Sequence, residues 1–422
     1  MLHSKSNCWL ALGTILAGLG AAGTASAAEN SVLLRYTAAL DGVDETFPVR
    51  QGTTSADNRT KQIVFDSRGR IVTCGYVVAN GKRQLLVARR NPDGTPDNGF
   101  GWQGLTTLPV AIESRPASCA IAAGDKVVVA LSTDDSTSWW LVKFNADGSI
   151  DGSFGIGGFS ATSASGCWEF APVDIKIAPD QKLVVAGTCW HTPLSSDFVV
   201  ARYSATGVLD TTFGGGVVSF DFDPAVGLTL GNLDRCRSLV LHKGFVILAG
   251  DTAPSPKGMV MARITSTGAL DKKEFVSFGP DLSEAANSVA VDSRDRIVLA
   301  GTVYASSRTP VPSAFAVARL NWAGGLDTTF SGDGLQTWAV FWPESGFASG
   351  AAVKIGSGDK IVVAGKLFLN DLDRLTVVRF LSNGEVEKGF ITRRFGPQKS
   401  GSDALVLDSS DRPLVAGFTA TP

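Results

Sequence analysis

Groups that could carry out catalysis are few and scattered in this sequence. Downstream of a predicted leader the only histidines are His191 and His242, so histidine bases are scarce. Asp221, Asp223 and Glu344 are carboxylates that could serve a hydrolase, but no spacing pairs them. The GxSxG and HExxH motifs of serine and zinc hydrolases are absent. We therefore predict no catalytic residue and no cofactor, with a hydrolase or lyase acting on an extracellular polymer as the alternative.

The cysteine pattern favours disulfides over a metal site. No CxxC pair occurs and histidines are few, so we expect no bound metal. Cys8 leaves with the leader, and the cysteines that remain are odd in number. Outside the cytoplasm an odd count implies at least one unpaired thiol or an intermolecular bond.

One disulfide is predicted when the cysteines are aligned on an internal repeat. Cys167 precedes the first strand of its unit and Cys189 follows the second, and a hairpin brings these two points together. We predict a Cys167–Cys189 disulfide, with Cys236 of the next unit as a competing partner on the same rim. Cys74 and Cys119 align with small apolar positions and are expected to be buried core residues.

Three arginines share one position of the repeat, shortly before the first strand. They are Arg59, Arg115 and Arg235. If first strands line a central channel, these guanidinium groups lie near its mouth and could bind an anion or a carboxylate. The alternative, which we favour, is ion pairing with neighbours such as Glu113 and Asp234.

A set of aromatic residues falls on the linkers that precede first strands or follow second strands. These linkers emerge on one face and vary most in length between units. Exposed aromatic clusters suit sugar rings or peptide partners, whereas buried ones would cover the ends of the core. We predict a binding face that contains Trp168, Trp190, Trp338, Phe341 and Trp342.

All of these residues are positioned by a repeat whose clearest copy spans residues 287–334. It contains four runs of β-branched and apolar residues separated by Gly, Asn, Asp and Ser clusters, a pattern typical of strands and turns. No stretch of useful length keeps a helical period. The runs are Ser288–Val291, Ile297–Ala300, Phe315–Leu320 and Leu326–Phe330. The closing aromatic recurs every 53 to 62 residues, at Phe47, Phe100, Phe154, Phe213, Phe275, Phe330 and Phe390.

The ends of the chain predict a closed ring. The mature chain begins with the second half of a unit and stops with the first half of one, so the two halves complete a seventh unit. A ring closed in this way has no exposed sheet edges. We predict an all-β, seven-bladed β-propeller of four-stranded blades, the last shared between the termini. The domain spans residues 29–422, with blades at 56–110, 117–162, 172–222, 236–280, 286–340, 350–397, and 401–419 with 31–50.

A second regularity pairs a base with an acid in every unit. A basic residue ends each third strand and an acid follows after the next turn, where the two face each other across a hairpin. We interpret these as structural ion pairs or turn caps. The pairs are Arg35/Asp44, Arg89/Asp97, Lys143/Asp151, Arg202/Asp210, Arg263/Asp271, Arg319/Asp327 and Arg379/Glu387.

Composition and the first residues predict an exported protein. Residues 1–28 read as a signal peptide, with an apolar run and the A-x-A site Ala25–Ala27. No later segment is long and apolar enough to span a membrane. The formal net charge is −2 and the pI about 6.0, so nothing argues for nucleic acid as a partner. The destination is the periplasm or the medium.

The repeat resembles the delta-60 repeat of bacterial exported proteins. The segments that carry the resemblance are FAVARLNWAGGLDTTFSGDG, FVVARYSATGVLDTTFGGG and LVKFNADGSIDGSFGIGG. The resemblance implies a propeller-like fold and export, and it brings no catalytic residues. We predict a binding or scaffolding module that recognises an envelope or extracellular protein or polysaccharide through its variable loop face.

Overall fold

The structure is a computed structural model that describes residues 31–36, 40, 59–79, 82–108, 115–132, 137–222, 233–253, 258–305, 313–338, 347–369, 372–387, 391–393 and 399–420. These residues form strands β1–β28 and one turn of 3-10 helix, Ser357–Asp359. Within these ranges, no helix has the length and apolarity needed to cross a membrane. The Phe341, Trp342, Asp44, Asp223 and Glu344 predictions lie outside them.

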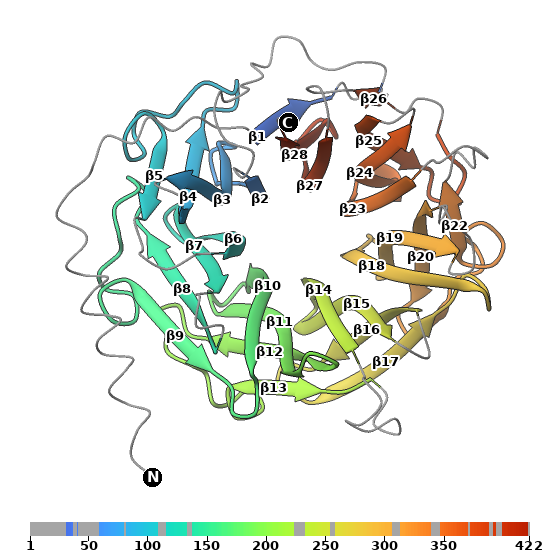
Figure 1. Ribbon diagram of the computed structural model, residues 1–422, viewed down its shortest axis with the longest axis horizontal. Helices are drawn as coiled ribbons and strands as arrows, with labels where there is room; N and C mark the ends of the chain where they lie inside the picture. The colour runs from blue at the N-terminus through green and yellow to red at the C-terminus, as the bar shows by residue number, and fades with distance from the viewer. Residues whose placement is uncertain are drawn as a thin grey trace.

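Antiparallel sheets follow one another around a ring (Figure 1). The first half contains β1 (Ser31–Arg35), β2 (Arg59–Phe65), β3 (Ile71–Ala79), β4 (Lys82–Arg90), β5 (Leu105–Leu108), β6 (Arg115–Ala122), β7 (Lys126–Ser132), β8 (Ser138–Phe144), β9 (Phe159–Ser163), β10 (Glu169–Ile177), β11 (Leu183–Thr192), β12 (Ser195–Tyr203) and β13 (Val217–Phe220). The second contains β14 (Leu233–His242), β15 (Phe245–Ala253), β16 (Gly258–Ile264), β17 (Leu270–Val276), β18 (Leu282–Val291), β19 (Ile297–Ala305), β20 (Ser313–Asn321), β21 (Gly324–Leu326), β22 (Leu335–Trp338), β23 (Phe347–Ile355), β24 (Ile361–Leu369), β25 (Leu372–Phe380), β26 (Ile391–Arg393), β27 (Lys399–Leu407) and β28 (Pro413–Ala420).

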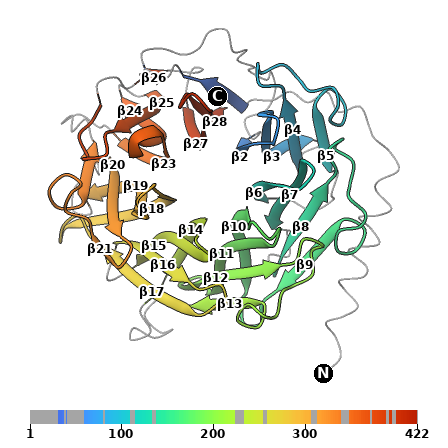
Figure 2. The same ribbon diagram turned by 180° about the vertical axis from the view of Figure 1, so that it is seen from behind.

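The first and last described strands close the ring. β1 pairs with β28 along its whole length, from Ser31 opposite Phe418 to Arg35 opposite Leu414, and β28 pairs in turn with β27. Strands β2, β6, β10, β14, β18, β23 and β27 face the centre, and β5, β9, β13, β17, β22 and β26 lie at the periphery (Figures 1 and 2). Pairing of the two chain ends removes the edges that an open sheet would expose.

Middle strands are apolar on both faces because each sheet packs between two neighbours. In β20, seven successive residues from Ala314 to Leu320 are buried. The buried clusters join adjacent sheets: Val72 and Leu85 of one sheet pack with Val127 and Trp140 of the next. Such a strand reads as an unbroken apolar run rather than an alternating one.

Every inner strand contains a β-bulge at the same point of the repeat. The residue that the bulge leaves out of register is Lys61, Ala117, Val173, Arg237, Asn287, Ala351 or Asp403. A bulge bends a strand and redirects one side chain. The bulge also explains the glycine that follows "VLA" in the repeat, because a Cβ on Gly301 would overlap the carbonyl oxygen of Ala285.

The predicted base–acid pair is present in six units of the described chain. These are Arg89–Asp97, Lys143–Asp151, Arg202–Asp210, Arg263–Asp271, Arg319–Asp327 and Arg379–Glu387. In the clearest copy, Arg319 is 1% exposed and its Nε donates to Asp327 Oδ2 at 2.8 Å. The same guanidinium lies over the Phe330 ring, 4.8 Å from its centroid, and donates through Nη1 to the Ser382 carbonyl in the next repeat at 2.5 Å.

Two disulfides cross-link the described chain. Cys167–Cys189 joins the turn before β10 to the end of β11, with Cα atoms 5.3 Å apart, as the repeat alignment predicts. Cys74 of β3 and Cys119 of β6 are also joined, with Cα atoms 6.2 Å apart. The expectation that these two are ordinary core residues is therefore wrong: they are buried, but they tie neighbouring sheets together. Cys236 is a buried free thiol, and burial raises its pKa.

We expect Arg319→Leu to lower the free energy of unfolding by about 3 kcal/mol, because breaking this buried ion pair leaves Asp327 with only a longer ion-pair contact among the described residues, 3.7 Å to Arg296. Arg294→Leu is the matched control, since Arg294 is 74% exposed and lies 3.6 Å from Asp359, and its loss should cost about 0.5 kcal/mol or less. Urea unfolding of both variants measures the difference. Equal losses would contradict a special role for the buried arginine.

Non-reducing peptide mapping should recover Cys74 with Cys119 and Cys167 with Cys189. Cys236 should react with iodoacetamide only after unfolding, because its thiol is buried and its pKa is raised. A Cys236 adduct formed in the native protein, or a peptide linking Cys236 to Cys189, would contradict these assignments.

Candidate functional site

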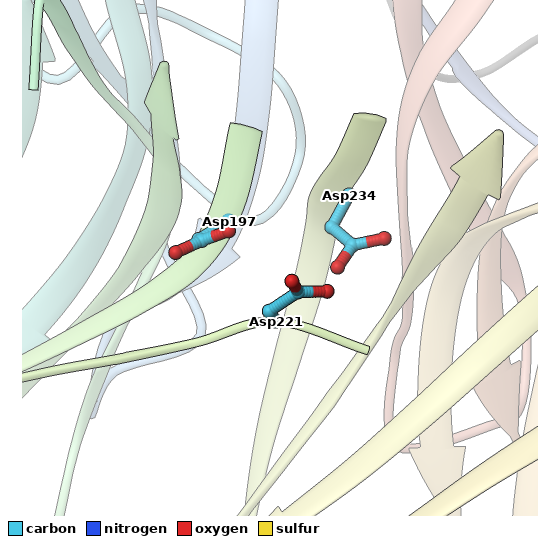
Figure 3. A group of neighbouring side chains, drawn as sticks. All are labelled: Asp197, Asp221 and Asp234. Carbon is cyan, nitrogen blue, oxygen red and sulfur yellow. The ribbon is translucent and has the colours of Figure 1, made fainter. Parts of the chain in front are cut away.

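Three carboxylates converge on one face of the ring. We call this side the loop face; on it β11 ends at Thr192, β12 begins at Ser195 and β14 begins at Leu233. Here two sheets meet, because Ser196 of β12 pairs in parallel with Leu233 of β14. Asp197, Asp221 and Asp234 lie at this junction (Figure 3).

The three aspartates come from separate segments. Asp197 lies near the start of β12, Asp221 follows the end of β13, and Asp234 is the second residue of β14. One carboxylate oxygen from each lies within 4.8 Å of the other two. Figure 3 shows the Asp221 and Asp234 carboxylates turned toward each other, with Asp197 on the other side of Asp221. No spacing in the sequence pairs Asp221 with another carboxylate, because its neighbours in the cluster lie on β12 and β14.

Hydrogen-bond donors hold two members of the cluster in place. His191 Nε2 lies 3.0 Å from Asp197 Oδ2, and Ser219 Oγ donates to the same oxygen at 3.4 Å. The other ring nitrogen of His191 lies 2.8 Å from the Gly166 carbonyl. The backbone amide of Phe222 donates to Asp234 Oδ2 at 2.6 Å.

The electrostatic environment sets Asp234 apart from the other two. Its side chain is fully buried (0% exposed), and its Oδ1 has no hydrogen-bond partner among the described residues. Burial raises its pKa to about 6, and the nearby charges of Asp221 and Asp197 add to the effect. The pKa of His191 is raised by its hydrogen bonds to Gly166 and Asp197, against an opposing effect of burial. Protonation of His191 would compensate part of the negative charge.

The arrangement can accept hydrogen bonds from a ligand or contribute oxygen atoms to a divalent cation. Asp197 and Asp221 are partly exposed, so a ligand or an ion could approach them from solvent. Oxygen donors suit Ca²⁺ or Mg²⁺, but three carboxylate oxygens fall short of the six or more that these ions take. A substrate could not reach Asp234 itself, because that side chain is fully buried.

The aromatic residues predicted for this face have different environments. Trp168 is 48% exposed, and its amide donates to the Trp190 carbonyl at 2.6 Å, in the same turn as Gly166. Trp190 is half-buried. Trp338 ends β22 and packs against Phe315 with ring centroids 5.4 Å apart. Of these three, only Trp168 is exposed, and its turn is linked to the aspartate cluster through the Gly166 carbonyl and His191.

The predicted arginines at the channel mouth are engaged in ion pairs where the structure describes them. Arg59 forms a two-point pair with Asp403 of the neighbouring inner strand. Arg235 pairs with Asp251 rather than with Asp234, the neighbour considered in the sequence. Arg115 begins β6 opposite Ser132. For Arg59 and Arg235, ion pairing accounts for the side chain, although with other partners than those named from the sequence.

A family model and several solved structures are similar to this chain. The family model "Domain of unknown function (DUF5122) beta-propeller" matches residues 69–100, 125–154 and 178–213. The chain contains β-propeller repeats.

Among solved structures, the polysaccharide lyase Uly1 aligns at 11% identity and a TM-score of 0.50, over 92% of this chain and 98% of that one. The periplasmic gluconolactonase PpgL of Pseudomonas aeruginosa aligns at 14% identity and 0.51, over 87% and 98%. At such identities the likeness shows the fold alone. No curated protein sequence matches the chain.

We expect the buried Asp234 carboxyl to make stability depend on pH. Its folded-state pKa lies above its unfolded value, so its ionisation opposes folding; the cost is absent below about pH 4 and fully present above about pH 7. Asp234→Asn keeps an oxygen for the Phe222 amide and removes the charge. Relative to the parent, the variant should gain up to about 3 kcal/mol of unfolding free energy between these limits.

Urea unfolding of both proteins in EDTA across that pH range tests this expectation. A stability difference that does not change with pH would show that Asp234 titrates normally.

Proposed function

We propose that this protein is an exported, non-enzymatic propeller that binds a polysaccharide of the envelope or the surroundings through its loop face. In this proposal the ring has seven blades of delta-60-type repeats, the last built from both termini. Support comes from the β1–β28 pairing, from the β-propeller repeats that the family model matches, and from the base–acid pair in each described unit.

The observation that carries the proposal is the exposed Trp168, which lies in the turn whose Gly166 carbonyl contacts His191 of the aspartate cluster. Sugar rings present apolar faces that stack on an indole and hydroxyl groups that donate to carboxylates. Trp168, Asp197 and Asp221 offer both kinds of group at one junction of the loop face, and His191 holds Asp197 in position. Among the described residues of this junction, the exposed large apolar side chains are Trp168 and Leu194, a smaller apolar surface than a flat protein interface would need.

We favour binding over catalysis because of Asp234. A hydrolase needs an acid with a raised pKa that reaches the substrate. Asp234 has the raised pKa, but its side chain is fully buried. The two structural neighbours are named as a polysaccharide lyase and a gluconolactonase, so propellers of this shape include enzymes, and the enzymatic alternative is tested together with binding.

Export is part of the same proposal. The two disulfides are typical of oxidising compartments. Together with the leader-like residues 1–28, they favour the periplasm or the medium as the site of function.

Polysaccharide from the producing organism's envelope and medium should be retained by immobilised mature protein. We expect Trp168→Ala to weaken retention at least tenfold and Asp221→Asn to weaken it severalfold, since each removes a contact with sugar. Trp102→Ala is the control, because Trp102 is 62% exposed in the turn between β4 and β5, on the opposite face of the ring.

Equal retention by the Trp168 variant would sink the loop-face site. Capture of a protein instead of a polysaccharide would replace the proposed ligand. Release of reducing ends or unsaturated sugars during incubation would establish the enzymatic alternative.

A further inference from the structure

The central channel contains a second candidate site, separate from the aspartate cluster. A cavity of about 310 Å³ is lined by inner strands from around the ring. A second, of about 460 Å³, extends toward the residues that begin these strands, including Arg59. The bulge residues Lys61, Val173, Arg237, Asn287, Ala351 and Asp403 line both cavities.

Cations outnumber anions in the wall of the inner cavity. Lys61, Lys176, Arg237 and Lys354 face it, against Asp174 and Asp403. The outer cavity adds Arg59 and Lys366 and no further acid. This excess is local, because the whole chain has a formal net charge of −2.

Both carboxylates of the channel wall are already engaged. Asp403 pairs with Arg59. Asp174 Oδ1 contacts Lys176 Nζ and accepts from Ser118 Oγ at 2.9 Å, and its Oδ2 accepts from the Leu239 amide at 3.1 Å. The acids therefore do not neutralise the rest of the channel.

Arg237 has a partner outside the cavity wall, but it shares that partner. Both Arg235 and Arg237 pair with the single carboxylate of Asp251. The group formed by Arg235, Arg237 and Asp251 thus has one more positive charge than negative charge. It adds to the positive potential at the loop-face end of the channel.

Lys61 and Lys354 are different from the other channel cations. Neither ammonium group makes a hydrogen bond or an ion pair with any residue in the part of the chain that the structure describes. Burial in the channel and the nearby charge of Lys176 lower the pKa of Lys354 to about 8. Burial and the charges of Arg59 and Arg83 lower the pKa of Lys61, and Asp403 opposes this effect. Both lysine side chains are half-buried, so they are partly desolvated, and neither has an ion-pair partner among the described residues.

We propose that the central channel binds a small oxyanion, such as a carboxylate, sulfate or phosphate group, at the cavity lined by Lys61 and Lys354. An oxyanion provides the acceptors that two ammonium groups lack, and the cavity of about 310 Å³ admits a group of this size. The anion is either a free inorganic ion or an acidic group on a sugar. This site is independent of the polysaccharide-binding proposal for the loop face.

Calorimetric titration with inorganic sulfate, inorganic phosphate and glucuronate, at low ionic strength, tests the site. The parent should bind at least one probe with one-to-one stoichiometry, and Lys61→Met and Lys354→Met should each weaken that affinity at least fivefold. Lys272→Met is the control, because Lys272 lies on the peripheral strand β17 and carries the same charge change. Preference for glucuronate over the inorganic ions would identify an acidic sugar as the source of the anion; the reverse would identify a free ion.

Thermal unfolding separates a binding role from a structural one. Without an added anion, Lys354→Met should melt at the same or a higher temperature than the parent, because it removes an unpaired charge. With the anion, the parent should gain stability and the variant should not. Failure of the parent to bind every probe, equal affinity in all variants, or a Lys354→Met protein that is less stable without an anion would overturn the proposal.

Discussion

In three repeats, the arginine that ends the third strand holds neighbouring repeats together. Its Nη1 donates to a turn carbonyl in the following repeat, from Arg202 to Ser266, from Arg263 to Trp322 and from Arg319 to Ser382. Its Nε is held by the acid of its own repeat, and in the Arg202 and Arg319 repeats the closing phenylalanine lies under the guanidinium. The basic residue and the "LDTTF" segment that follows it therefore recur together because the aspartate and the phenylalanine of that segment both contact the guanidinium. A closed ring needs contacts at each junction, because an open junction would expose the apolar faces of two neighbouring sheets.

The bulges of the inner strands give the channel a lining that differs from one repeat to the next. The residue after a bulge often bonds to the next inner strand: Ser118 donates to Asp174, and Ser288 accepts from the Val353 amide. The bulge residue itself faces the cavity, and its identity changes from lysine to valine, asparagine or aspartate around the ring. The fold thus constrains the residues before and after each bulge, whereas the bulge residue itself sets the chemistry of the cavity wall.

The repeat was predictable because each copy shows the same residues in the same order, and the second strand of the clearest copy begins at Ile297 as expected. The aspartate cluster was not, because Asp197, Asp221 and Asp234 come from two sheets and meet only when the ring packs. The sequence suggested an ion pair between Arg235 and its neighbour Asp234, but the Arg235 guanidinium pairs with Asp251 across the hairpin. The Cys74–Cys119 disulfide was not predicted from the aligned repeats. An alignment compares equivalent positions of the repeats, whereas this disulfide joins different positions of two adjacent repeats.

Charge pairing distinguishes the structural from the functional side chains of this ring. Cations that recur at the end of the third strand, such as Arg89 and Arg319, lie 2.8 Å from the acid of the same repeat, and this ion pair accounts for their place in the fold. Lys61 and Lys354 make no ion pair with a described residue, and their surroundings in the channel lower their pKa values. Lys354 shares its position in the repeat with Lys176, which pairs with Asp174. An unpaired ammonium in such a place opposes folding, whereas a methionine of similar volume would not. The stability of the ring does not explain these two lysines, and a counter-charge from outside the chain does.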